Sequence, residues 1–154
     1  MNVLPREMSR AYNYLSADNT CLTEGEWFDL SSIAPHYIMG PFVQDKRTFV
    51  KLFSDKLEKG AAAAVEHLQS RERLKLTFDT AALPHLGFLA QQGYDALGDG
   101  YFSGELLLAF EPTTGIGDVV ATGIQTRTLK VLAAGATISF WIRIAVEEVK
   151  NYVP

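Results

Sequence analysis

The residue of this sequence best placed for acid–base chemistry is Glu111. It follows a largely apolar run over 105–110 and stands directly before Pro112, whose ring fixes the backbone of a turn. A carboxylate that is held rigidly and partly buried at the end of a strand is suited to act as a general base. The same position also suits a glutamate that closes the turn or pairs with a lysine, so the spacing alone leaves both roles open.

The histidines and the cysteine do not form a metal-binding pattern. His36, His67 and His85 are far apart in the sequence, and Cys21 is the sole cysteine. One cysteine allows neither a thiolate metal site nor an intrachain disulfide. The sequence also lacks a Gly-rich phosphate loop, a nucleophile elbow and a His-Glu-x-x-His motif. We therefore expect no metal site.

The composition is that of one ordinary globular domain. The chain has 154 residues and a formal net charge of -4, and no stretch gathers enough lysine and arginine to make a basic face for nucleic acid. Residues 1–10 carry three charges and lack the apolar segment of a signal peptide. No apolar stretch approaches the length of a membrane span. These features predict a single cytoplasmic domain over 1–154, with neither nucleic acid nor membrane as a partner.

Alternation of apolar and polar residues predicts several strands. The clearest is 137–146, in which Ile138, Phe140 and Ile142 share one face. The others are 49–53, 73–79, 105–111 and 128–132, and residues 25–30 are expected to be a loop that runs into a short strand. Glycines and prolines separate these runs, and short strands separated in this way are typical of an antiparallel β-sandwich or barrel.

One segment carries conflicting signals. Residues 61–68 begin with four alanines, which favour a helix. Gly60 precedes the segment and Gln69-Ser70-Arg71 follows it, which favours a strand that enters a hairpin turn. These residues by themselves leave helix and strand open.

Three motifs follow one another in the second half of the chain. They are Leu-Pro-His-Leu-Gly-Phe-Leu at 83–89, Glu-Pro-Thr-Thr-Gly at 111–115, and a strand, Gly turn and long strand over 129–144. In order and spacing they resemble the C-terminal half of the aldose 1-epimerase (galactose mutarotase-like) family, and residues 14–30 are a looser match. The family fold is a large antiparallel β-supersandwich. The resemblance therefore implies an all-β antiparallel sandwich, and it favours a strand at 61–68.

The resemblance also implies a reaction. Members of the family interconvert the α and β anomers of free aldoses by acid–base ring opening, and they need neither a metal nor an organic cofactor. By position, Glu111 is the base that takes the proton of the sugar's C1 hydroxyl. Aromatic rings such as Phe88 and Tyr94 are expected to stack on the sugar, and His85 is expected to contact it or to pack beside the site. The family's acid is a histidine, and this chain begins just after the point that corresponds to it.

Two alternatives to catalysis follow from that missing histidine. The protein either binds carbohydrate without turning it over, or serves as a structural, oligomerising β-sandwich in which Glu111 only closes a turn. Half of a supersandwich leaves strand edges and an apolar face exposed, such as one that carries Leu107 and Trp141. A homodimer that covers these edges is the simplest way to protect them.

Overall fold

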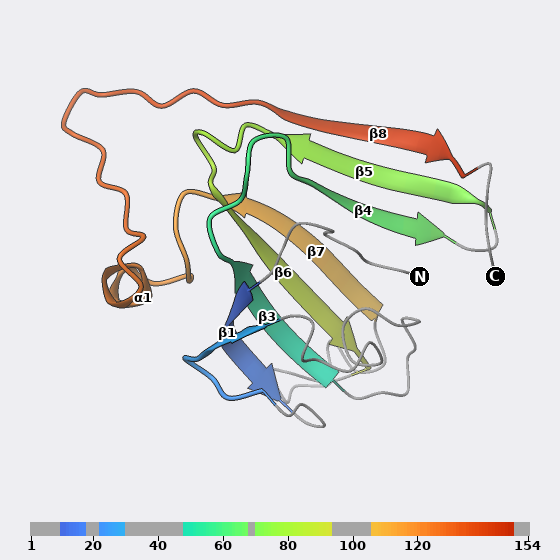
Figure 1. The fold of residues 1–154 in the computed structure, drawn as a ribbon, viewed down its shortest axis with the longest axis horizontal. Helices are drawn as coiled ribbons and strands as arrows, with labels where there is room; N and C mark the ends of the chain where they lie inside the picture. The colour runs from blue at the N-terminus through green and yellow to red at the C-terminus, as the bar shows by residue number, and fades with distance from the viewer. Residues whose placement is uncertain (1–9, 18–21, 30–47, 68–69, 94–105, 150–154) are drawn as a thin grey trace.

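The computed structural model describes residues 10–17, 22–29, 48–67, 70–93 and 106–149 (Figure 1). Along the chain they form β1 (Arg10–Ala17), β2 (Trp27–Asp29), β3 (Thr48–Ser54), β4 (Ala62–His67), β5 (Glu72–Phe78), β6 (His85–Gln92), β7 (Leu106–Thr113), α1 (Val120–Gln125) and β8 (Ile142–Glu148). Every pairing among these strands is antiparallel. No helix in these ranges combines the length and the apolar character that a bilayer crossing requires.

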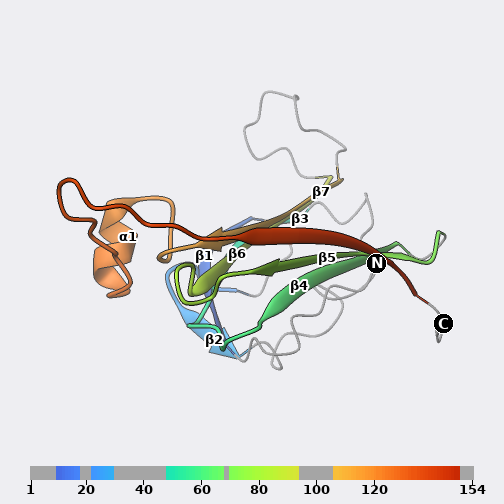
Figure 2. The same cartoon turned by 90° about the horizontal axis from the view of Figure 1, so that it is seen from above.

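The strands form two sheets. One has five strands in the order β2-β1-β3-β6-β7, and the other has three in the order β4-β5-β8. Figure 1 shows the smaller sheet above the larger one, and Figure 2 shows the same arrangement after a quarter turn. The expectation of an all-β, mostly antiparallel, sandwich-like fold is confirmed.

An apolar cluster joins the two sheets. Ala63 of β4 and Phe78 of β5 pack together with Leu86 of β6, and all three side chains are almost fully buried. Phe110 of β7 packs against the same cluster. Burying one such phenylalanine or leucine stabilises a fold by about 1.5–3 kcal/mol, so this cluster fixes the smaller sheet on the larger one.

The strand register divides the larger sheet into two faces. Residues that lie opposite one another in antiparallel strands point to the same side. Leu52 of β3 lies opposite Phe88 of β6, and these buried residues belong to what we call the core face. Gly87 of β6 lies opposite both Phe53 of β3 and Glu111 of β7. These three residues, with Lys51, belong to what we call the site face.

Most of the strands predicted by alternation are present. The predictions at 25–30, 49–53, 73–79 and 105–111 correspond to β2, β3, β5 and β7. The alanine-rich segment 61–68 is mainly strand, as β4. It pairs along its whole length with β5, so tertiary pairing overrides the helix propensity of alanine.

Two predictions downstream were wrong. Residues 128–132 form no strand, and in 137–146 the strand begins only at Ile142. The reason lies in β5, the partner of β8, which ends at Phe78. There the Asp79 carboxylate accepts a hydrogen bond from the Ala81 N–H and turns the chain away. Among the described strands, none therefore pairs with the residues before Trp141.

The helix α1 was not predicted. Its sequence, Val-Ala-Thr-Gly-Ile-Gln, contains a glycine and three β-branched residues and has low intrinsic helix propensity. The turn is held instead by hydrogen bonds at its end, where the Thr126 N–H and hydroxyl both donate to the Thr122 carbonyl oxygen.

Candidate functional site

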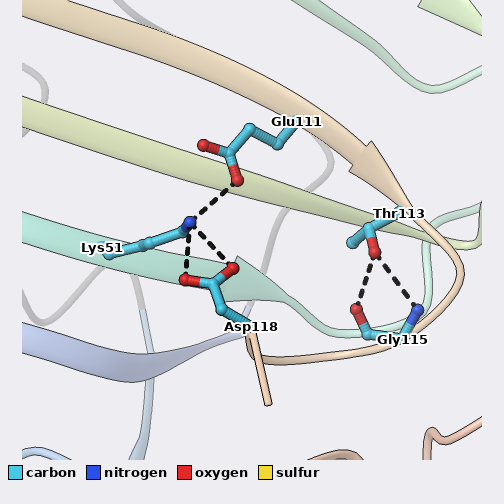
Figure 3. Close-up of polar contacts among 5 residues, drawn as sticks. All are labelled: Lys51, Glu111, Thr113, Gly115 and Asp118. Carbon is cyan, nitrogen blue, oxygen red and sulfur yellow. Dashed lines mark hydrogen bonds and ion pairs between the residues drawn. The ribbon is translucent and has the colours of Figure 1, made fainter. Parts of the chain in front are cut away.

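Three charged side chains meet on the site face. The Nζ atom of Lys51 lies 3.0 Å from Oε2 of Glu111 and 2.8 Å from Oδ2 of Asp118 (Figure 3). Lys51 is on β3, Glu111 is on β7, and Asp118 is in the loop that follows β7. The lysine side chain is 9% exposed, whereas the carboxylate side chains are 38% and 48% exposed. A buried cation thus holds two carboxylates that remain open to solvent.

Glu111 lies within a strand and not in the turn that follows it. β7 continues through Pro112 to Thr113, so the expected end of the strand before the proline was wrong. Pairing with β6 persists across the proline, where Leu86 lies opposite Pro112. Because β7 is the last strand of its sheet, the missing N–H of a proline is tolerated there.

Gly87 has no side chain, and this leaves space for the Glu111 side chain to cross β6. A Cβ atom at this position would lie 3.1 Å from Cβ of Glu111 and 3.2 Å from Cε1 of Phe53. Those distances are shorter than ordinary van der Waals contact. The absence of a side chain on β6 therefore allows Glu111 to reach from β7 to Lys51 on β3.

We expect Gly87→Ala to lower the free energy of unfolding by about 1–2 kcal/mol, as overpacking of a tight contact does. Urea denaturation followed by tryptophan fluorescence measures the change. In a Phe53→Leu background the same substitution is expected to cost less, because one of the crowding atoms is gone. A Gly87→Ala protein that is more stable than the wild type would show that the space is not tight.

The charge of Lys51 is fixed by its neighbours. Burial of the amine by itself disfavours the protonated form. The hydrogen bonds and charges of Asp118 and Glu111 outweigh that penalty, and the pKa of Lys51 is raised above its ordinary value of 10.5. Lys51 is therefore a permanent cation at neutral pH.

The loop after β7 holds Asp118 in place. The Thr113 hydroxyl donates to the Gly115 carbonyl oxygen at 3.0 Å (Figure 3). The Ile116 N–H donates to Oγ1 of Thr128 at 2.8 Å, and the Ile116 side chain is buried. Two residues later the chain reaches Asp118, so its carboxylate is carried by an anchored loop.

Aromatic rings form one side of the cluster. Nζ of Lys51 lies 5.6 Å from the centre of the Phe53 ring, within range of a cation–π contact. Tyr14 meets Phe53 edge to face at 5.7 Å, and Tyr12 meets Trp27 in the same way at 5.5 Å. Phe53 and Tyr12 are buried, whereas Tyr14 and Trp27 are partly exposed. The accessible ring surface therefore comes from Tyr14 and Trp27.

Of the other predicted site residues, His85 shares the face of Glu111, because it lies two positions before Gly87, the residue opposite Glu111. Phe88 is on the core face, opposite Phe110, and so points away from Glu111. His85 is buried, and its Nδ1 atom lies 3.1 Å from the Ser54 carbonyl oxygen, which gives it a packing role. Tyr94 lies outside the described residues.

The remaining histidines and the cysteine provide no described partner for Glu111. His67 is exposed in the β4–β5 hairpin, where its ring nitrogen contacts the Ser70 hydroxyl. His36 and Cys21 lie outside the described residues. Within the ranges that the structure covers, no three histidine, cysteine, aspartate or glutamate side chains gather as metal ligands.

A cavity of about 670 Å³ lies elsewhere, at one end of the smaller sheet. Trp141, Asp79 and the lysines Lys56 and Lys59 line it. Glu111 is not among its lining residues, so this cavity is separate from the charged cluster.

Lys51 and Asp118 were not identified from the sequence. The run Phe-Val-Lys-Leu-Phe at 49–53 does contain a signal, because a lysine amid apolar residues of a strand that is buried on both faces needs a carboxylate partner. Lys51 lies two residues before Phe53, so both side chains point to the face of the sheet that carries Glu111. No such signal exists for Asp118, which depends on the path of a loop.

Comparison of the chain with protein-family models, with curated proteins and with solved structures gave no match.

Proposed function

We propose that this is a carbohydrate-related, aldose 1-epimerase-like protein in which Glu111 acts as the general base. The observation that carries the proposal is the position of Glu111: a half-exposed carboxylate held by a buried lysine on the face of a sheet. A general base must be fixed in place and still be reachable by the proton it removes. The motif resemblance at 83–89 and 111–115 supports the same assignment.

Lys51 and Glu111 have different roles in the proposed reaction. Lys51 stays protonated at neutral pH and donates to Oε2 of Glu111, which fixes the orientation of the carboxylate. The other carboxylate oxygen, Oε1, forms no hydrogen bond or ion pair with the residues drawn in Figure 3, which leaves it available to a C1 hydroxyl. The partly exposed ring of Tyr14, which packs edge to face on Phe53 beside Lys51, offers an apolar surface of the kind that a pyranose C–H face contacts.

A second candidate is carbohydrate binding without turnover. It is favoured by the position of the described histidines: His85 is buried against Ser54, and His67 pairs with Ser70 in a hairpin. Neither imidazole forms a hydrogen bond or ion pair with Glu111 in the part of the chain that the structure covers. Ring opening needs an acid at the ring oxygen as well as a base.

Polarimetry separates these candidates. Freshly dissolved α-glucose and α-galactose are followed to anomeric equilibrium with the protein, with heat-denatured protein and with buffer alone. We expect acceleration by the native protein only. A sugar that binds without turnover gives no acceleration but raises the melting temperature, since saturation at 100 times Kd stabilises the native state by about 2.7 kcal/mol. The absence of both effects would reject a carbohydrate function.

A further inference from the structure

β8 presents an open edge of the smaller sheet. In the strand order β4-β5-β8 it is the last strand, and among the described residues it pairs only with β5 (Figure 1). Seven consecutive residues, Ile142–Glu148, are extended along this edge. An edge of this length with no blocking proline offers a row of free N–H and C=O groups to another strand.

The apolar side chains of this strand are uncovered. Ile142, Ile144 and Val146 share the face that carries Phe78 and the other core residues of β5, yet they are 46%, 66% and 69% exposed. Apolar residues this open to water mark an interaction surface.

The opposite face of β8 carries two charged side chains, Arg143 and Glu147, that have no close ion-pair partner among the described residues. In the described ranges Arg143 forms no ion pair. Glu147 has only distant partners, the Arg73 and Lys75 side chains at 3.9 Å each. Arg143 and Glu147 stand at equal distances on either side of Ala145, the middle residue of the strand.

We propose that two copies of this chain associate by antiparallel pairing of β8 with β8 about a two-fold axis at Ala145. Residues equally far from Ala145 then lie opposite one another. Arg143 faces Glu147 of the partner subunit, and Ile144 faces Val146 of the partner subunit. The pairing thus forms two ion pairs on one face and two apolar pairs on the other.

The charges select this register over its neighbours. An axis at Arg143 would place the two Arg143 side chains opposite each other, and an axis at Glu147 would do the same with two glutamates. Like charges directly opposite each other destabilise a sheet. With the axis at Ile144, Arg143 faces Ala145 of the partner subunit and gains no charge partner. Of these registers only the axis at Ala145 pairs Arg143 with Glu147 of the partner subunit. It keeps Ile144 opposite Val146, places Ile142 opposite Glu148 of the partner subunit, and joins the two small sheets into one continuous sheet.

The first test is a charge exchange followed by light scattering or sedimentation. The wild type is expected at twice the mass of one chain. Arg143→Glu places like charges opposite one another and raises the dissociation constant about tenfold or more. The double variant Arg143→Glu/Glu147→Arg restores the pairing and the dimer, whereas Lys130→Glu, an exposed site outside β8, leaves the mass unchanged.

A cross-link test does not depend on the charge variants folding well. In a Cys21→Ser background, Ala145→Cys places two thiols opposite one another across the axis, within reach of a disulfide. Arg143→Cys is the matched control, because its two thiols lie about 13 Å apart along the strands. Rapid oxidation to a covalent dimer in the first variant alone supports the register. A monomeric wild type, or equal cross-linking by both variants, overturns the proposal.

Discussion

Glu111→Gln is expected to lower the rate of anomer interconversion by about 10²- to 10⁴-fold, the range that a positioned general base contributes. The amide keeps the size of the side chain and can still accept a hydrogen bond from Lys51, so the cluster keeps its geometry. What it loses is the ability to take a proton from the C1 hydroxyl. Polarimetry at saturating α-galactose measures the effect directly.

Two control variants separate base catalysis from loss of charge. Asp118→Asn also removes a carboxylate from Lys51, and we expect it to lower the rate by much less than Glu111→Gln because Asp118 is not the base. Glu58→Gln removes an exposed carboxylate outside the cluster and should leave the rate unchanged. If Glu111→Gln keeps the wild-type rate while the native protein accelerates the reaction, another group is the base.

The parts of the fold that could be predicted are those in which local pattern and tertiary pairing agree. In 73–79 every second residue is apolar, and Leu76 and Phe78 of β5 pack against the larger sheet on that side. The alternation in 137–146 is just as regular, yet its first residues form no strand. Alternation states only that a segment suits a sheet, and a strand also needs a neighbour, which the turn at Asp79 removes.

Some residues of the candidate site could be predicted from the sequence, and others could not. Glu111 was identified because a carboxylate beside a proline after an apolar run is visible in the sequence. Phe88 was assigned to the same site from its residue type, but the register places it on the core face. In a strand, one residue of displacement reverses the face, so assignment of a side chain to a site requires the strand pairing. That pairing also identifies Lys51, which shares the parity of Phe53.

Lys51→Met is expected to lower the free energy of unfolding at pH 7 by about 2–3 kcal/mol. Methionine retains the apolar stem but leaves Glu111 and Asp118 facing each other without their common cation. Removing one partner of a fully buried pair costs about 3–5 kcal/mol, and the half-exposed carboxylates regain part of that by hydration. Lys130→Met, at an exposed lysine, should change stability by less than about 0.5 kcal/mol. Urea denaturation measures both.

The same variant gives a pH signature that a packing defect does not. Because the pKa of Lys51 is raised on folding, the native state binds this proton more tightly than the unfolded chain does. The stabilisation is therefore complete below pH 10.5, the ordinary pKa of the amine, and is lost as the pH rises through the higher pKa of the folded state. The stability difference between the wild type and Lys51→Met should stay constant from pH 7 to 9 and narrow above pH 10.5. A difference that stays the same in strongly alkaline solution would mean that Lys51 stabilises the fold through its stem and not through its charge.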